Sequence, residues 1–258
     1  MAYQTIILER QNYVGLITLN RPEQLNIFNT KLATELNESL LEMDKDRQVR
    51  AIIIKGAGRA FCAGIDLNEL AGKSTLEIRD WIKLMDAHNI TIANLGKPVI
   101  AAVHGAAVAN GCGLAAACDL TVASEGARFG TTAINVGLYC FGPSAPVSRC
   151  LGKKKSLELL LTGDIIDAKE ANRIGLVNKV VPPEKLEEAA MKLAQKLTSK
   201  SPVALRMGKT SFYKMSNMGY DEALTYLAEV FTTLCGTEDA KEGVSAFLNK
   251  RQPKWNEC

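Results

Sequence analysis

The chain has 258 residues, enough for one large domain or two small ones, and its formal net charge is +3 with both signs mixed along its length. The hydrophobic fraction of 47% and the charged fraction of 23% are ordinary for a globular protein. Because no concentrated basic stripe and no apolar run of roughly 18 residues occurs, we expect neither a nucleic-acid partner nor a membrane span.

The seven cysteines form no C-x-x-C pair and no regular spacing. An odd number without a framework argues against a disulfide scaffold and predicts a reducing compartment, the cytoplasm or another one. The first residues lack the pattern of a signal peptide. The sequence also lacks metal-ligand spacing and the glycine motifs of nucleotide sites, so we expect no metal and no cofactor of those kinds.

The first half of the chain alternates strand and helix patterns. Apolar spacing predicts a helix over 32–43, and Ser74 with Glu77 forms a capping-box pattern that opens a helix ending before Lys97. This alternation predicts βα units with a largely parallel core. We expect its strands at residues 5–8, 16–19, 51–54, 99–103 and 120–123.

Residues 97–120, KPVIAAVHGAAVANGCGLAAACDL, carry the most informative pattern in the chain. They predict a buried strand, a turn at His104-Gly105 and a helix of small residues over 110–119. The N-terminus of such a helix offers unpaired N–H groups and a positive dipole end, which can bind an oxyanion or a polarised carbonyl oxygen. Residues 59–67, RAFCAGIDL, form a second glycine-containing turn that could supply another N–H group.

The pattern becomes helical after about Pro143. Asp167 and Glu170 form a second capping-box pattern, and residues 177–181 predict a late strand. The sequence therefore predicts a βα core over residues 1–195, followed by a helical C-terminal region over 196–258. We expect the helices of the second half at residues 153–161, 184–197, 222–234 and 237–249.

Six segments, taken in order, resemble the crotonase family, also called the enoyl-CoA hydratase/isomerase superfamily. The resemblance implies an α/β fold, the crotonase-like ββα spiral core, with a C-terminal helical trimerisation region that builds homotrimers, often paired into hexamers. It also implies an acyl-CoA thioester as the substrate, with coenzyme A as part of that substrate rather than a separate cofactor. The segments are residues 15–26, 59–67, 97–120, 129–137, 161–176 and 242–255, so they cover nearly the whole chain.

The same resemblance assigns an oxyanion hole to two backbone N–H groups, those of Ile65 and Asn110. Two such donors would polarise the thioester carbonyl and stabilise an enolate or a tetrahedral anion. The alternative is that both segments are merely tight turns supported by glycine.

Two groups of residues are implied as contacts of coenzyme A. Phe247 and Lys250, from the C-terminal helix of the same or a neighbouring subunit, would approach the adenine and the phosphates. The alternative for this pair is a core phenylalanine beside a solvated basic face. The other group would lie beside the pantetheine and the adenine: Gln24, Leu25, Ala63 and Leu67.

Hydratases of the family use two glutamates, at positions where this chain has Gly113 and Ala133. Adding water across a double bond needs a base for the water and an acid for the α-carbon, and each group typically contributes about 10²–10⁴-fold. Their absence argues against ordinary enoyl-CoA hydration and against isomerisation through these positions. Among nearby carboxylates, Asp66 is expected to hold its loop, whereas Glu69 could swing toward the pocket.

Tyr139 and Cys140 are candidate residues of the acyl pocket. A decarboxylating branch of the family places a Tyr at the position of Cys140, but it also uses a His where this chain has Ile65. Cys140 could act as a nucleophile if an adjacent cation lowered its pKa. No His is adjacent to it in the sequence, so a buried, inert thiol is the other interpretation.

Three functions stay open. The favoured one is decarboxylation or thioester hydrolysis of an acyl-CoA, because the loss of CO₂ to a stabilised enolate needs no base. The second is enoyl-CoA hydration by a relocated acid/base pair. The third is a non-catalytic, acyl-CoA-binding protein that kept the fold.

Overall fold

The computed structural model describes residues 3–255 and contains two β-sheets. The main sheet has six strands in the order β1-β2-β3-β4-β6-β9; β1 and β2 pair antiparallel and the other neighbours pair parallel. The smaller sheet has the order β5-β7-β8. The strands are β1 Ile6–Gln11, β2 Val14–Leu19, β3 Ala51–Gly56, β4 Val99–Val103, β5 Ala106–Val108, β6 Leu120–Ser124, β7 Arg128–Gly130, β8 Ile165–Asp167 and β9 Lys179–Val181.

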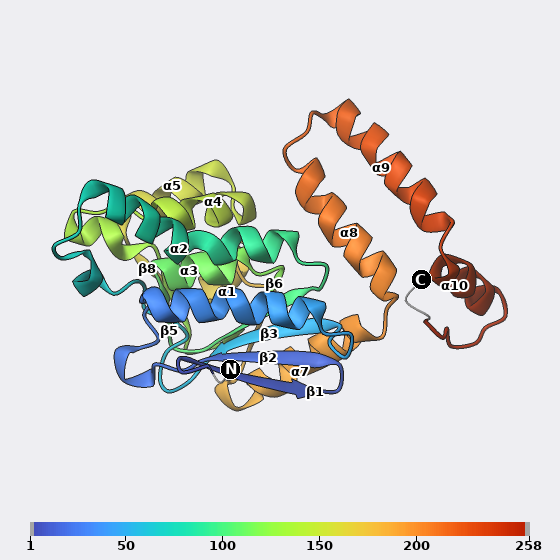
Figure 1. Ribbon diagram of the computed structural model, residues 1–258, viewed down its shortest axis with the longest axis horizontal. Coiled ribbons are helices and arrows are strands. Elements are labelled where there is room, and N and C mark those ends of the chain that lie inside the picture. The colour runs from blue at the N-terminus through green and yellow to red at the C-terminus, as the bar shows by residue number, and fades with distance from the viewer. Residues whose placement is uncertain (1–2, 256–258) are drawn as a thin grey trace.

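The helices connect the strands, and four of them, α7 to α10, follow the last strand (Figure 1). The α-helices are α1 Thr30–Lys45, α2 Thr75–Asn94, α3 Asn110–Ala117, α4 Phe141–Cys150, α5 Lys153–Thr162, α6 Ala168–Arg173, α7 Leu186–Thr198, α8 Pro202–Met215, α9 Tyr220–Cys235 and α10 Glu238–Leu248. Four short 3₁₀-helices are η1 Pro22–Gln24, η2 Leu67–Leu70, η3 Thr132–Val136 and η4 Pro183–Lys185.

Both faces of the main sheet are covered, which explains why β4 is apolar at every position. Val99, Ala101 and Val103 join the larger core, which also contains buried side chains of α1, α2 and α3. Ile100 and Ala102 point the other way and join a second core beneath α7. A parallel strand buried on both faces is expected to read as a continuous hydrophobic run rather than an alternating one. The predicted α/β class with a parallel core is therefore confirmed.

The first predicted capping box is confirmed, whereas only half of the second is present. Ser74 accepts the Glu77 N–H, and the Glu77 carboxylate accepts the Ser74 N–H at 2.8 Å. Asp167 accepts the Glu170 N–H at 2.8 Å, but the Glu170 carboxylate pairs with Arg173 at 2.6 Å instead of returning to Asp167. The prediction of a reciprocal box at α6 is therefore wrong, because a cation competes for the carboxylate.

Several elements were not expected from the sequence. The strands β5, β7 and β8 have three residues each, which is too short for a hydrophobic period to be recognised. Helix α4 contains Gly142, Pro143 and Pro146, residues that normally weaken a helix signal. Pro143 lies in the first turn, where its missing N–H costs little, whereas Pro146 lies inside the helix. The helix lies directly against α3.

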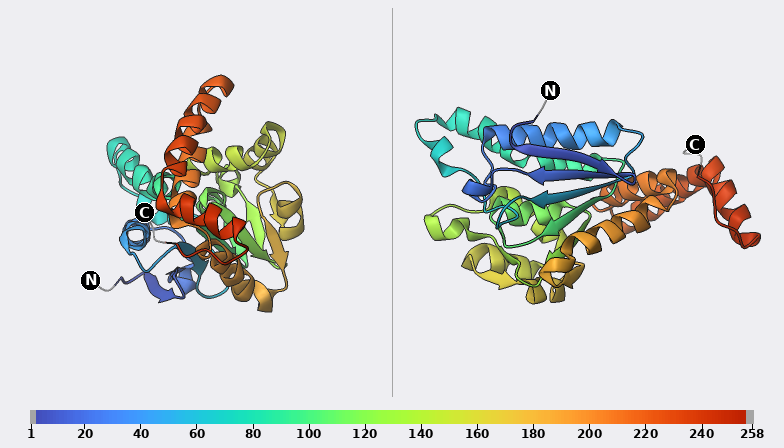
Figure 2. Two further views of the ribbon diagram at one scale, coloured as in Figure 1. Left: turned by 90° about the vertical axis from the view of Figure 1, so that its right-hand side faces the viewer. Right: turned by 90° about the horizontal axis from the view of Figure 1, so that it is seen from below.

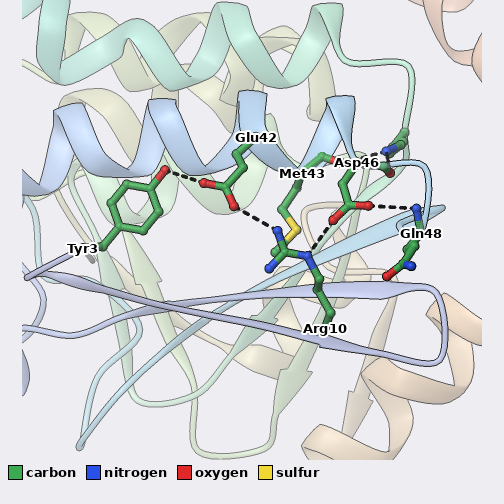
Figure 3. Close-up of polar contacts among 7 residues, drawn as sticks. Tyr3, Arg10, Glu42, Met43, Asp46 and Gln48 are labelled. Carbon is green, nitrogen blue, oxygen red and sulfur yellow. Dashed lines mark hydrogen bonds and ion pairs between the residues drawn. The ribbon is translucent and has the colours of Figure 1, made fainter. Parts of the chain in front are cut away.

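A polar network fastens α1 to the β1–β2 hairpin at the edge of the sheet (Figure 3). Arg10 pairs with Asp46 at 2.6 Å and with Glu42 at 2.9 Å, and the Tyr3 hydroxyl donates to Glu42 at 3.0 Å. Burial and the neighbouring carboxylate raise the pKa of Tyr3 to about 12. Because Arg10 and Glu42 are substantially exposed, each ion pair contributes no more than about 1 kcal/mol.

Helices α8, α9 and α10 extend away from the sheets as an arm (Figures 1 and 2). Asp119, which follows α3, anchors the base of this arm. Its carboxylate accepts the Val99 N–H at 2.7 Å and the Tyr213 hydroxyl at 2.9 Å, and it pairs with the Lys209 ammonium at 2.7 Å. The predicted boundary between residues 195 and 196 falls inside α7, three residues before its end at Thr198, and remains a prediction of domain organisation.

We expect Asp119→Asn to destabilise the fold by about 3–5 kcal/mol, because it leaves the Lys209 ammonium, whose side chain is 7% exposed, without its opposite charge. Urea unfolding followed by circular dichroism measures this change. The matched control is Glu238→Gln, which removes an ion pair whose side chains are 61% exposed and should change stability by less than about 0.5 kcal/mol. Equal effects of the two variants would contradict the anchoring role of Asp119.

Candidate functional site

The candidate site lies where three neighbouring parallel strands end. Leu19 of β2 is opposite Gly56 of β3, and Lys55 of β3 is opposite Ala102 of β4. The loops that follow these strands therefore leave the sheet side by side at its carboxyl edge, the edge where α/β proteins usually bind ligands. Both glycine turns identified in the sequence lie in these loops.

The two turns are joined by backbone hydrogen bonds and by direct contact. Cys62 donates its N–H to the Ala106 carbonyl at 3.0 Å and accepts the Val108 N–H at 3.0 Å. A Cβ added at Gly111 would lie 2.0 Å from the Cys62 carbonyl oxygen. Only glycine fits this position, so the start of α3 packs directly against the backbone of the turn at residues 59–67.

Unusual backbone angles shape both turns. Gly64 has a φ of +118°, and Ala109, the residue before α3, has φ 49° and ψ −119°. A left-handed alanine of this kind costs on the order of 1–3 kcal/mol and persists only where its surroundings hold it. Here the Ala109 N–H donates to the Gly130 carbonyl at 2.8 Å. This strained turn directs the N-terminus of α3 toward Gly64, since a Cβ at Gly64 would lie 3.2 Å from the Ala109 Cβ.

The backbone N–H groups of Ile65 and Asn110 are both free to bind a ligand. The Phe28 N–H donates to the Gly64 carbonyl at 2.8 Å and the Asp66 N–H donates to the Phe28 carbonyl at 2.7 Å, so the amide of Ile65 faces away from Phe28. Asn110 is the first residue of α3, and its N–H has no acceptor within its own helix. Within residues 3–255, neither N–H has a hydrogen-bond acceptor.

The residues implied for coenzyme A divide between two ends of the molecule. The Ala63 N–H donates to the Leu25 carbonyl at 3.0 Å, which brings the exposed Gln24 beside the first turn, and the half-exposed Leu67 begins η2 nearby. Phe247 and Lys250 lie at the end of α10, on the arm far from these loops (Figures 1 and 2). Phe247 is 82% exposed, which contradicts its interpretation as a core residue. One subunit alone does not bring the two groups together.

Neither of the two positions implied for the hydratase glutamates carries a carboxylate. A Cβ added at Gly113 would lie 3.0 Å from the Cα, Cβ and Cγ of Pro143, so the Pro143 ring fills the space beside this helix position. Ala133 is the second residue of η3, and its backbone makes a hydrogen bond with the Cys140 thiol. The two positions therefore face α4 and the segment that precedes it.

Cys140 is buried and its environment does not activate it. Burial raises the pKa of the thiol, and the nearby Asp86 carboxylate raises it further, against the lowering effect of the Ala133 hydrogen bond. A thiol whose pKa is raised is a poor nucleophile at neutral pH, which favours the inert interpretation. Tyr139 is half-buried, and its ring centroid lies 4.8 Å from that of Phe141.

Asp86 of α2 is the residue of this region that the sequence reasoning missed. Its carboxylate accepts the Asn110 side-chain N–H at 3.3 Å. A Cβ added at Gly142 would lie 2.0 and 2.2 Å from its two oxygens, so the carboxylate rests on the first turn of α4. Burial raises the pKa of Asp86 to about 6, against the lowering effect of Asn110. The one signal in the sequence is an acidic residue next to Met85, which belongs to the buried face of α2.

Glu69 and Asp66 are both engaged in structural contacts. Glu69 accepts the Thr30 N–H and the Trp81 indole N–H, each at 2.8 Å. Burial raises the pKa of Glu69, but these donors outweigh it and the net pKa is lowered. Asp66 caps η2 and lies 3.7 Å from Arg21. Glu69 is thus fixed where α1, η2 and α2 meet, and the expectation that it swings toward the pocket is not supported.

One cleft of the described residues lies away from both turns. It has a volume of about 510 Å³ and lies beside the segment between α1 and β3 and the start of α8, with Arg47, Arg50 and Arg206 in its lining. None of its lining residues belongs to either turn.

Among residues 3–255, no group of three His, Cys, Asp or Glu side chains could hold a metal ion, and no helix is long and apolar enough to cross a membrane.

Residues 9–258 match the family described as "Enoyl-CoA hydratase/isomerase". The chain belongs to this family.

Members of the family resemble the chain along their whole length. A protein of Rhizobium meliloti named "Probable enoyl-CoA hydratase" is 41% identical over 258 residues, 99% of each chain, and the "Short-chain-enoyl-CoA hydratase" of Clostridium acetobutylicum is 37% identical over 98% of this chain and 97% of its own. The crystal structure of an enoyl-CoA hydratase of Mycobacterium smegmatis superposes with a TM-score of 0.94 at 37% identity, covering 98% of this chain and 99% of the other. Its similarity confirms the predicted crotonase fold.

We expect Gly111→Ala to lower the free energy of unfolding by about 2–3 kcal/mol and to weaken acyl-CoA binding. The added Cβ would overlap the Cys62 carbonyl oxygen and push the two glycine turns apart. Unfolding in urea and calorimetric titration with butyryl-CoA measure the two effects. Gly126→Ala is the control, since nothing lies within 4 Å of its added Cβ. Wild-type stability and binding in Gly111→Ala would show that the turns need no close contact.

Proposed function

We propose that the protein is an enzyme that adds water to 2-enoyl-CoA thioesters, or removes it in the reverse direction. The thioester oxygen binds between the N–H groups of Ile65 and Asn110. The observation that supports this proposal most is the pair of unpaired backbone donors on two turns that touch. Loss of one such donor has cost about 2.7–4 kcal/mol of transition-state stabilisation in an enzyme where it was measured.

Hydration is favoured over the reactions that the sequence alone favoured. Relatives that match the chain along its whole length carry hydratase names, including the short-chain enzyme of Clostridium acetobutylicum. The absence of carboxylates at Gly113 and Ala133 had argued for decarboxylation, which needs no base. Under the present proposal the proton-transfer group occupies another position, and the raised pKa of Cys140 speaks against a thiol-dependent thioester hydrolysis.

The arm completes the coenzyme A site of a neighbouring subunit in this proposal. None of the residues of α9 is buried, and Phe231 on α9 and Phe247 on α10 are 66% and 82% exposed. Large apolar side chains gathered on an extended arm favour a protein interface. Packing of the arm against a second copy would cover these side chains and could carry Phe247 and Lys250 toward the Gln24 loop of that copy.

The wild-type protein is expected to hydrate crotonyl-CoA with a turnover number on the order of 1–10³ s⁻¹. Loss of the absorbance of the conjugated thioester follows the rate, and mass spectrometry identifies the product by the gain of one water. Malonyl-CoA is the matched alternative substrate in the same buffer. Release of CO₂ from malonyl-CoA without hydration of crotonyl-CoA would replace this proposal by decarboxylation, and binding of both thioesters without turnover would leave a non-catalytic protein.

Sedimentation equilibrium is expected to give the mass of a trimer or a hexamer. Phe231→Glu places a charge on the exposed face of α9 and should shift the protein toward the monomer and weaken butyryl-CoA binding. Leu76→Glu is the control, because Leu76 is similarly exposed at 63% but lies at the start of α2, away from the arm. A monomeric wild-type protein that binds butyryl-CoA normally would contradict the role of the arm.

A further inference from the structure

The carboxylate of Asp86 is held next to the proposed binding point of the thioester. Asn110 supplies one of the two oxyanion N–H groups from its backbone, and its side-chain amide donates to Asp86 at 3.3 Å. Only the Asn110 side chain therefore separates the Asp86 carboxylate from the proposed position of the thioester oxygen. The α-carbon of a bound acyl group is two bonds from that oxygen, so a group placed here lies close to the carbon that must gain or lose a proton.

Asp86 also borders the two positions that lack carboxylates. It rests on Gly142, the residue before the Pro143 that packs on Gly113. It also interacts electrostatically with Cys140, whose thiol makes a hydrogen bond with the backbone of Ala133. The carboxylate therefore comes from α2 into the same region from which side chains at 113 and 133 are missing.

The remaining contacts of Asp86 leave it able to react. The other two nearby carboxylates are already engaged. Asp66 caps η2 and lies beside Arg21, and Glu69 accepts hydrogen bonds from Thr30 and Trp81. Asp86 instead accepts one hydrogen bond of 3.3 Å from the neutral side-chain amide of Asn110, and its side chain is only half-buried. A carboxylate that is partly desolvated and lightly hydrogen-bonded is suited to exchange protons with a ligand.

We propose that Asp86 is the acid–base group of this site, acting alone in place of a pair of carboxylates. The proposal deepens the proposed function and rests on the placement of the thioester oxygen between Ile65 and Asn110. In hydration, the Asp86 carboxylate accepts a proton from water while the water oxygen bonds to the β-carbon. The electrons of the double bond move to the enolate oxygen, which the two N–H groups stabilise.

The second step returns Asp86 to its carboxylate form. The protonated Asp86 donates the same proton to the α-carbon, the carbonyl re-forms, and the carboxylate is ready for another cycle. One molecule of water is added, no electrons are gained or lost, and a single group moves a single proton. Dehydration follows the same path in reverse.

The proposal predicts how the reaction rate depends on pH, because the ionised Asp86 carboxylate starts both hydration and dehydration. The pKa of about 6 predicts that the rate rises as pH passes through about 6 and then levels off. Cys140 faces Asp86 from the segment before α4 and Asn110 faces it from α3. On α2 itself, Lys83 lies on the exposed surface 3.9 Å from Asp80.

The test is hydrogen exchange at the α-carbon of butyryl-CoA in deuterated water, read by mass spectrometry. This saturated thioester cannot be hydrated, so its exchange reports the base and the oxyanion hole independently of hydration. Asp86→Asn should slow the exchange about 10²–10⁴-fold while butyryl-CoA still binds. Asp80→Asn, on the exposed face of α2, is the matched control and should exchange within about twofold of wild type.

A second variant tests whether the position of the Asp86 carboxylate matters, without changing the carboxylate itself. Gly142→Ala keeps Asp86 but places a Cβ about 2 Å from its oxygens, so the carboxylate must move and exchange should fall at least tenfold. The wild-type exchange rate should also rise through pH 6. Exchange that is unchanged in Asp86→Asn, or flat between pH 5 and pH 8 in the wild type, would overturn the proposal.

The same measurements separate this proposal from the proposed function. Asp86-dependent exchange without hydration of crotonyl-CoA would support Asp86 and overturn hydration. Hydration that survives in Asp86→Asn would support hydration and overturn the role of Asp86. Absence of both exchange and hydration in the wild-type protein would overturn both.

Discussion

The close approach of Gly111 to the Cys62 carbonyl is the contact on which the site depends. It sets the first turn of α3 against the loop that follows β3, with no side chain between them. Ala109 and Gly64, both with positive φ, then bring the residues that carry the two unpaired N–H groups onto adjoining turns. The parallel sheet makes this contact possible, because β3 and β4 end next to each other.

A second constraint is the space beside the two donors. In this chain Pro143 packs on Gly113, Cys140 lies against Ala133, and the carboxylate of Asp86 reaches over from α2. Asp86 is thus a half-buried acid in this space, and the side-chain amide of Asn110 donates to it. If the Asn110 N–H binds the thioester oxygen as proposed, thioester binding and proton transfer would be coupled through this one residue.

The features that could be predicted from the sequence are those with local causes. The buried run of β4, the Ser74–Glu77 capping box and both glycine turns follow from neighbouring residues, and the family resemblance supplied the fold. Asp86 could not be predicted, because its burial comes from α3 and α4, whose contacts with α2 are long-range. The separation of α10 from the loop that follows β2 likewise depends on where the arm points, which no local pattern encodes (Figures 1 and 2).

The Pro143 ring beside Gly113 has a consequence for any redesign of this protein. The Cβ of a side chain introduced at 113 would lie 3.0 Å from the Cα, Cβ and Cγ of Pro143, so the ring or the α4 backbone would have to move by a few tenths of an ångström to admit it. The size of the side chain that position 113 can accept is therefore set by the residue at 143. A carboxylate engineered on α3 at this position would be best tolerated together with a smaller residue at 143.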